Sequence, residues 1–184
     1  MNWATRISIF RILLAPAFVT ALVYYSPEKP SLLTLAAAIF GFACFTDALD
    51  GYLARRLKQV TDFGTYIDPI ADKALLLSGF LSLSFMSHLP SGMRIPAWVT
   101  ISVVTRDIVI IIGSTVIFFT TGRLKAKPLF IGKLTTVFQM AALFLALLQA
   151  PSSVLTVLFD VVAILTVVSG IQYIQVGGKI VQAS

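Results

Sequence analysis

Six apolar stretches of about 20 residues take up most of this sequence, and they constrain its fold more than any other feature. Such stretches cross the hydrocarbon core of a membrane as helices, because the backbone must satisfy its own hydrogen bonds there. The composition agrees, with 58% hydrophobic and 12% charged residues and a mean hydropathy of +0.93. Breaks rich in proline, glycine and charge separate the expected spans, which are 7–25, 31–56, 66–87, 95–120, 129–149 and 153–176.

The spacing of these stretches predicts an all-α integral membrane protein with six transmembrane helices and short loops. None of the breaks is long enough for a second domain, so we expect residues 1–184 to form a single transmembrane domain. The first span has no small-residue cleavage pattern and is read as uncleaved. Before it, Trp3 and Arg6 suit a short interfacial stretch at headgroup level.

Basic residues indicate the orientation. The loops after the second and fourth spans are rich in lysine and arginine, whereas the opposite side has only Lys29 and Arg94. The positive-inside rule then places both termini and the two basic loops in the cytoplasm. Topology and attraction to anionic lipid headgroups explain most of the net charge of +6. We therefore expect a multi-pass protein of the bacterial cytoplasmic membrane and no nucleic-acid partner.

Four aspartates lie where the second and third spans meet the cytoplasm. Asp47 and Asp50 are three residues apart, and Asp68 and Asp72 are four apart, so each pair shares one face of its helix. A short hairpin between antiparallel spans would bring the two pairs together. Uncompensated carboxylates are costly in such partly desolvated surroundings. Hard divalent cations with oxygen ligands, Mg²⁺ or Mn²⁺, are their natural partners.

Small residues and one arginine accompany these carboxylates. Gly51 and Ala54 leave little side-chain bulk beside Asp50, so a substrate could approach the backbone. Arg55 offers a planar donor fork that suits phosphate. Gly64 is expected just before the third span, where it would supply a tight turn or open space. Together these residues indicate a phosphate-bearing substrate.

This stretch resembles the signature of the CDP-alcohol phosphotransferases at every fixed position and spacing, and the resemblance extends to the length and the number of spans. The matching pattern is Asp47-x2-Asp50-Gly51-x2-Ala54-Arg55-x8-Gly64-x3-Asp68-x3-Asp72. A lone pair of aspartates on a helix would be a weak signal. Eight residue identities with fixed gaps, in a membrane context, are a strong one.

The resemblance implies an enzyme that moves a phosphatidyl group from CDP-diacylglycerol to a hydroxyl acceptor, with release of CMP, and it implies a homodimer. Two divalent ions would hold the diphosphate of the CDP-lipid, and Asp72 would complete the acidic cluster and act as the general base. Arg55 would fix the diphosphate or the cluster, and three small residues would make room for the cytidine. The residues implied to bind the CDP-lipid are Asp47, Asp50, Gly51, Ala54, Arg55, Gly64 and Asp68, and those implied to hold metal are Asp47, Asp50, Asp68 and Asp72.

The acceptor is read from other stretches. "ISIFRILLAP", "TDFGTYIDPIADK" and "GKLTTVFQ" resemble both phosphatidylglycerophosphate synthases, which use sn-glycerol 3-phosphate, and CMP-forming cardiolipin synthases, which use phosphatidylglycerol. The run "DIVIIIGSTVIFF" after Arg106 departs from the "LREW"-like run of the first group. We expect sn-glycerol 3-phosphate because cations near the cytoplasmic mouth suit a phosphorylated acceptor, with cardiolipin synthesis as the alternative.

Two cations are candidates for binding that acceptor. Lys133 should lie at the cytoplasmic mouth, although a lysine there could equally snorkel to the interface. Arg106 lies about halfway through the fourth span, and an intramembrane charge is a functional hypothesis by default. A structural ion pair with another helix is its rival interpretation. Adjacent side chains on a helix point about 100° apart, so Arg106 is not expected to pair with Asp107.

Two different classes of protein also fit parts of this pattern. A divalent-cation transporter could use the acidic residues, but its site is expected near the bilayer midplane between repeats or broken helices, and the sequence shows no repeat. A lipid-binding scaffold could use the basic face but does not require the acidic spacing. The enzyme is therefore the favoured hypothesis.

Overall fold

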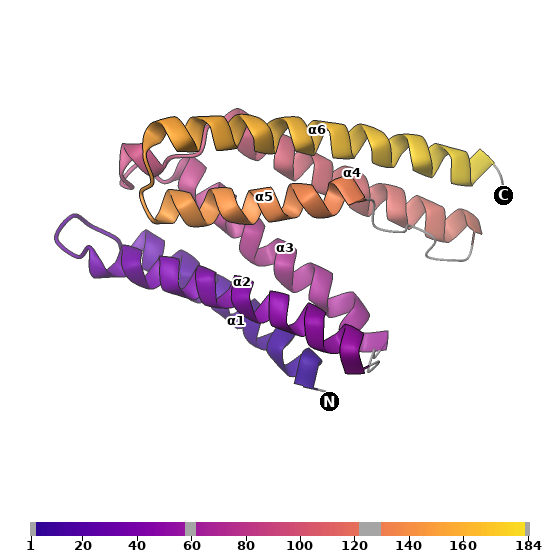
Figure 1. The fold of residues 1–184 in the computed structure, drawn as a ribbon, viewed down its shortest axis with the longest axis horizontal. Helices are drawn as coiled ribbons and strands as arrows, with labels where there is room; N and C mark the ends of the chain where they lie inside the picture. Colours follow the sequence, from indigo (N-terminus) through magenta and orange to yellow (C-terminus); the bar gives the residue numbers. More distant parts are fainter. Residues whose placement is uncertain (1–2, 58–61, 122–129, 183–184) are drawn as a thin grey trace. The chain divides into compact units, whose positions relative to one another are not determined.

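The computed structural model describes residues 3–57, 62–121 and 130–182, with the side chains of residues 3–9, 48–72 and a few near the other gaps left out (Figure 1). This part of the chain contains six α-helices, a single-turn 3₁₀ helix at Ser91–Met93 and no strand, which confirms the all-α prediction. The α-helices are α1 (Trp3–Val23), α2 (Ser31–Leu57), α3 (Asp62–Phe85), α4 (Ala97–Thr121), α5 (Phe130–Leu147) and α6 (Ser152–Gln182).

Several helices extend past the predicted apolar limits. α3 begins at Asp62 and α6 continues to Gln182. Hydropathy marks only the apolar part of a helix, whereas the backbone can stay helical in the polar sequence beyond it. An aspartate also suits the first turn of a helix, where N–H groups are free. Gly64 therefore precedes the predicted span 66–87 but lies on helical backbone in the first turn of α3 rather than in a tight turn.

Three helical stretches in the described part are long and apolar enough to cross a membrane, namely Ser91–Ile117, Phe130–Leu147 and Ser152–Gly178. Shorter apolar helical stretches occur at Phe10–Val23, Ser31–Asp47 and Lys73–Phe85. Large apolar side chains such as Phe119 and Phe130, each 79% exposed, cover the helix surfaces. An exposed apolar surface of this kind needs lipid around it, so the chain has the character of an integral membrane protein.

The chain divides into two compact units, which are described separately. The first comprises residues 1–94 and 143–152. Here α1 packs against α2 and α3, and the rings of Phe18 and Phe40 lie 5.8 Å apart at their centroids in the buried core. His88 Nε2 donates to the carbonyl oxygen of Leu22 over 2.8 Å, which ties the segment that follows α3 to the end of α1.

The second unit, residues 95–142 and 153–184, contains α4, most of α5 and α6. Polar side chains join its helices. Gln139 Nε2 donates to Thr166 Oγ1 over 3.2 Å, and Ser114 Oγ lies 2.6 Å from Tyr173 Oη. Such interhelical hydrogen bonds matter in lipid, where the hydrophobic effect does not hold helices together. The same unit contains Arg106, the arginine predicted to bind the acceptor.

Candidate functional site

The signature falls on helical backbone on both sides of the gap at 58–61. α2 carries Asp47 and Asp50, and α3 carries Asp68 and Asp72, so the spacings of three and four residues keep each pair on one helix face. The side chains of Asp50, Gly51, Ala54, Arg55, Gly64, Asp68 and Asp72 lie outside the described part of the structure. Their roles remain predictions, and Asp47 is the one signature side chain whose contacts are described.

Asp47 pairs with an arginine from α1. Arg11 Nη1 donates to Asp47 Oδ1 over 2.9 Å, and the two side chains are 3% and 34% exposed. A guanidinium buried to this degree requires a carboxylate partner. Arg11 occupies Oδ1 of Asp47, and the Asp47 side chain remains partly exposed. This arrangement fits the predicted part of Asp47 as an oxygen ligand of Mg²⁺ or Mn²⁺.

The sequence interpretation missed Arg11. It lies within the first predicted span, 7–25, so the rule for intramembrane charges that selects Arg106 also selects Arg11. The stretch around it was used for its family resemblance alone. Asking which carboxylate such an arginine could reach would have pointed to the aspartates at the end of a neighbouring helix.

Arg106 is largely enclosed in the second unit, with its side chain 9% exposed. Its Nη1 donates to Asp107 Oδ1 over 2.8 Å, and its Nη2 donates to Ser169 Oγ on α6 over 2.9 Å. The prediction that Arg106 and Asp107 would not pair is therefore wrong. The angle of about 100° between neighbours applies to their Cβ directions, whereas the long arginine stem lets the guanidinium fold back to the adjacent carboxylate.

A glycine of α5 faces the same guanidinium. A Cβ at Gly132 would lie 3.0 Å from Arg106 Nη2 and 3.5 Å from Ser169 Oγ. The structure thus brings Arg106 to the turn of α5 that carries Lys133. Lys133 itself is exposed, and as the next residue its side chain leaves the helix about 100° away from the Gly132 position. The backbone of Lys133 therefore lies close to Arg106, but the side chains of the two predicted acceptor cations do not lie on the same face of α5.

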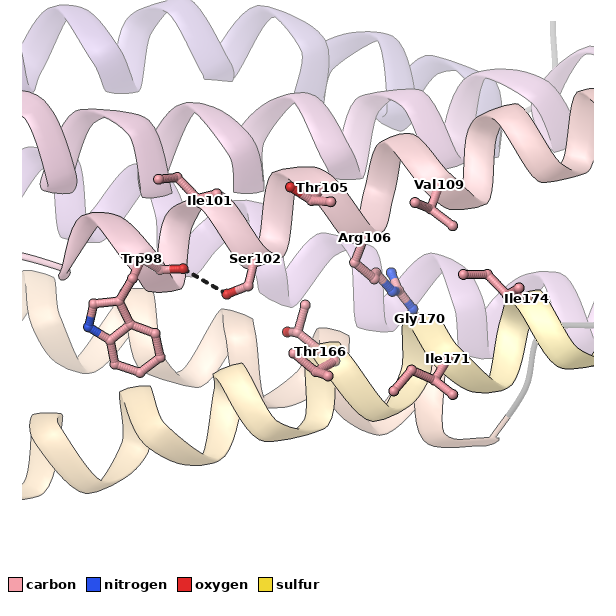
Figure 2. A pocket seen from close by; sticks show the side chains of 11 residues that line it. Trp98, Ile101, Ser102, Thr105, Arg106, Val109, Thr166, Gly170, Ile171 and Ile174 are labelled. Carbon is pink, nitrogen blue, oxygen red and sulfur yellow. Dashed lines mark hydrogen bonds between the residues drawn. The ribbon is translucent and has the colours of Figure 1, made fainter.

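A cavity of about 400 Å³ lies between α4 and α6 beside the Arg106 stem. Figure 2 shows Arg106 reaching from α4 toward Gly170 on α6. Most of the lining is apolar, which suits a hydrocarbon chain better than a small water-soluble phosphate ester. The lining residues are Trp98, Ile101, Ser102, Thr105, Arg106, Val109, Thr166, Val167, Gly170, Ile171 and Ile174.

An all-α chain with the helices of a membrane protein and an acidic signature at helix ends defines a class of membrane-embedded transferases that act on phosphate-bearing substrates. Residues 1–172 match the CDP-alcohol phosphatidyltransferase family, and the chain belongs to that family. It is an enzyme of phospholipid biosynthesis.

Relatives with assigned names cover nearly the whole chain. It is 37% identical over 177 residues to a Mycobacterium tuberculosis protein named "Probable phosphatidylglycerophosphate synthase", covering 94% of this chain and 80% of the relative. Two proteins named CDP-diacylglycerol–glycerol-3-phosphate 3-phosphatidyltransferase are similar as well. The Pectobacterium atrosepticum protein is 36% identical over 94% of this chain and 93% of its own length. The Haemophilus influenzae protein is 37% identical over 92% of this chain and 90% of its own length.

Proposed function

We propose that this protein transfers the phosphatidyl group of CDP-diacylglycerol to sn-glycerol 3-phosphate, forming phosphatidylglycerophosphate and CMP. The complete acidic signature from Asp47 to Asp72 carries the donor and the reaction type. Relatives named for this reaction, similar over more than nine-tenths of the chain, support the acceptor. The protein would work as a homodimer with six membrane spans, with the signature and both termini on the cytoplasmic side.

The signature residues have separate tasks in this proposal. Asp47, Asp50 and Asp68 would hold two divalent ions, Mg²⁺ or Mn²⁺, with Asp72 beside them. When bound, the ions supply charge neutralisation for the diphosphate and alignment of the displacement. Arg11 keeps the Asp47 carboxylate in place through Oδ1.

Asp72 would take the proton from the acceptor hydroxyl. That oxygen forms a new bond to the lipid-side phosphorus, the bond from this phosphorus to the bridging oxygen breaks, and CMP leaves with the bond electrons. Gly51, Ala54 and Gly64 would leave room for the cytidine, and Arg55 would bind the diphosphate.

Arg106 and Lys133 would bind the phosphate of the acceptor. The support is local. Arg106 is largely enclosed and donates to Ser169 on α6, and Gly132 of α5, which faces its guanidinium, directly precedes Lys133. Arginine and lysine are the side chains that bind phosphate in proteins, the first as a fork and the second as a point charge.

The test is CMP release by purified, lipid-reconstituted protein supplied with CDP-diacylglycerol, Mg²⁺ or Mn²⁺ and one acceptor at a time. We expect sn-glycerol 3-phosphate to give CMP and a new phospholipid, while inositol phosphate and serine do not. Phosphatidylglycerol as the productive acceptor would instead establish cardiolipin synthesis. If no acceptor yields CMP, the proposed transfer from CDP-diacylglycerol fails.

Two variants assign the chemistry. Asp72→Asn keeps the shape of the side chain but removes the base, so turnover should fall by about 10²-fold or more. Asp160→Asn is the matched control, because Asp160 is exposed on α6 and lies outside the signature. Lys133→Ala should raise the KM for sn-glycerol 3-phosphate much more than that for CDP-diacylglycerol, and equal losses would remove Lys133 from the acceptor site.

A further inference from the structure

We propose that Ser169 and Gly132 are positioning residues that set the orientation of the Arg106 guanidinium toward the phosphate of the acceptor. This inference rests on the proposed function of Arg106. The two residues come from different helices, α6 and α5, and both lie close to Arg106 Nη2. Ser169 Oγ accepts from Arg106 Nη2 over 2.9 Å, and a Cβ at position 132 would lie 3.0 Å from it.

The ion pair with Asp107 cannot fix this orientation alone. Asp107 is the next residue on α4, so its contact with Arg106 Nη1 joins the guanidinium to a residue of its own helix. Ser169 relates the guanidinium to α6 through a neutral hydroxyl, without adding charge. An arginine that binds phosphate through its planar fork needs a defined orientation of that plane. The hydroxyl supplies the missing constraint.

Gly132 provides the space that this orientation needs. A separation of 3.0 Å between a Cβ and a guanidinium nitrogen is tighter than most such contacts, so the guanidinium would have to shift by a few tenths of an ångström to admit any side chain at 132. A glycine inside a helix costs stability relative to alanine. Its presence facing Arg106 is explained if the guanidinium must lie close to α5.

One nitrogen of this guanidinium has no hydrogen-bond partner in the described part of the chain. Arg106 Nε is buried, and no hydrogen-bond acceptor meets it within the described part of the chain. Buried polar groups nearly always have a partner. A guanidinium that is held at Nη1 and Nη2 but retains an unused donor is prepared for a further acceptor, and an anionic phosphate oxygen is the strongest acceptor available to it.

The alternative is a hydrogen bond that merely joins α4 to α6, and the chain contains a control for it. Ser114 Oγ on α4 lies 2.6 Å from Tyr173 Oη on α6, so Ser114→Ala removes one bond between the same two helices without touching Arg106. Ser169→Ala also removes one hydroxyl from this helix pair. The two variants should cost similar stability, which leaves the kinetics to separate them.

The experiment compares steady-state kinetics of the full chain reconstituted in lipid. Ser169→Ala should raise the KM for sn-glycerol 3-phosphate about fivefold to tenfold, the loss of one hydrogen bond, and leave the KM for CDP-diacylglycerol unchanged. Ser169→Thr keeps the hydroxyl and should restore the wild-type KM. Gly132→Ala should raise the same KM, while Ser114→Ala should change neither. Equal effects of Ser169→Ala and Ser114→Ala, or equal effects on both substrates, would overturn the inference.

Arg106→Ala separates this inference from the proposed function. If it leaves the KM for sn-glycerol 3-phosphate unchanged, Arg106 does not bind the acceptor, and the premise itself is wrong. If Arg106→Ala raises that KM while Ser169→Ala and Gly132→Ala do not, Arg106 binds the acceptor without their help, and only the positioning inference falls.

Discussion

In the part of each compact unit that the structure describes, one arginine is largely enclosed, and the two differ in where the carboxylate partner comes from. Arg11 on α1 pairs with Asp47, 36 residues away on α2. Arg106 pairs with the very next residue, Asp107. Both arginine side chains are nearly enclosed, but the Asp47 side chain is 34% exposed and that of Asp107 only 3%.

This difference separates two uses of a buried cation. The Arg11 pair connects two helices and holds a signature carboxylate that still faces outward, so it should respond to charge brought to the acidic cluster. The Arg106 pair neutralises a charge inside one helix, and a hydroxyl on α6 relates it to the rest of the unit. It should respond to packing and to loss of its own countercharge.

The largest expected effect is the loss of protein stability when the Arg106–Asp107 pair is broken. Asp107→Ala leaves the Arg106 guanidinium buried without its carboxylate and should destabilise the protein by about 3–5 kcal/mol. Adding Arg106→Met removes the stranded charge and should recover most of that loss. Unfolding in detergent measures both variants. A double variant as unstable as Asp107→Ala alone would show that the loss comes from packing rather than from charge.

The next effect contrasts the glycines of the two units. In the first, a Cβ at Gly79 would lie 3.0 and 3.1 Å from the methyl carbons of the fully buried Leu143. Gly79→Ala should therefore cost about 1–3 kcal/mol by overpacking, measured by unfolding, and leave the KM for sn-glycerol 3-phosphate unchanged.

Gly132→Ala should affect acceptor binding rather than stability, because the atom closest to the new Cβ is Arg106 Nη2, at the end of a flexible side chain. Its unfolding temperature should change little, while its KM for sn-glycerol 3-phosphate rises. If both variants lose stability alike and bind the acceptor normally, the contrast between a packed core and an adjustable site disappears.

These examples show how far sequence reasoning reaches. Helices follow from long apolar stretches, and the signature follows from fixed spacings, so the all-α class and the helical placement of Asp47 could be predicted. The partner of Arg106 could not, because it depends on how a flexible stem folds back over its own helix. Sequence periodicity describes where a side chain leaves the backbone, not where its far end lies.

Ser169 and Gly132 illustrate a second limit. A serine in an apolar helix is common and carries no signal of its own. A glycine in a helix is recognisable only as a cost in stability. Both become informative when three helices bring them to one guanidinium, and that depends on tertiary packing. Arg11 was within reach of sequence reasoning, because a lone arginine in an apolar span calls for a carboxylate.

A metal titration tests whether the Arg11–Asp47 pair lies at the predicted metal site. Without Arg11, Asp47 has lost the cation beside it, so a divalent ion should bind the cluster more tightly in Arg11→Gln than in the wild type. Tenfold tighter binding would add about 1.4 kcal/mol to the stabilisation by saturating Mn²⁺. The measurement is the unfolding temperature against Mn²⁺ concentration, with Arg106→Gln as control. Equal gains in both variants would place Asp47 away from the ions.

The smallest expected effect comes from a substitution beside the aliphatic part of the Arg106 side chain rather than beside its guanidinium. A Cβ at Gly170 would lie 3.7 Å from Arg106 Cγ, an ordinary contact, so Gly170→Ala should be accepted and should stabilise α6 by up to about 1 kcal/mol. The KM for sn-glycerol 3-phosphate should stay at the wild-type value, since the guanidinium contacts are untouched. Unfolding and kinetics of this variant check both points. A raised KM would mean that the position of the stem, and not only the hydroxyl of Ser169, sets the orientation of the guanidinium.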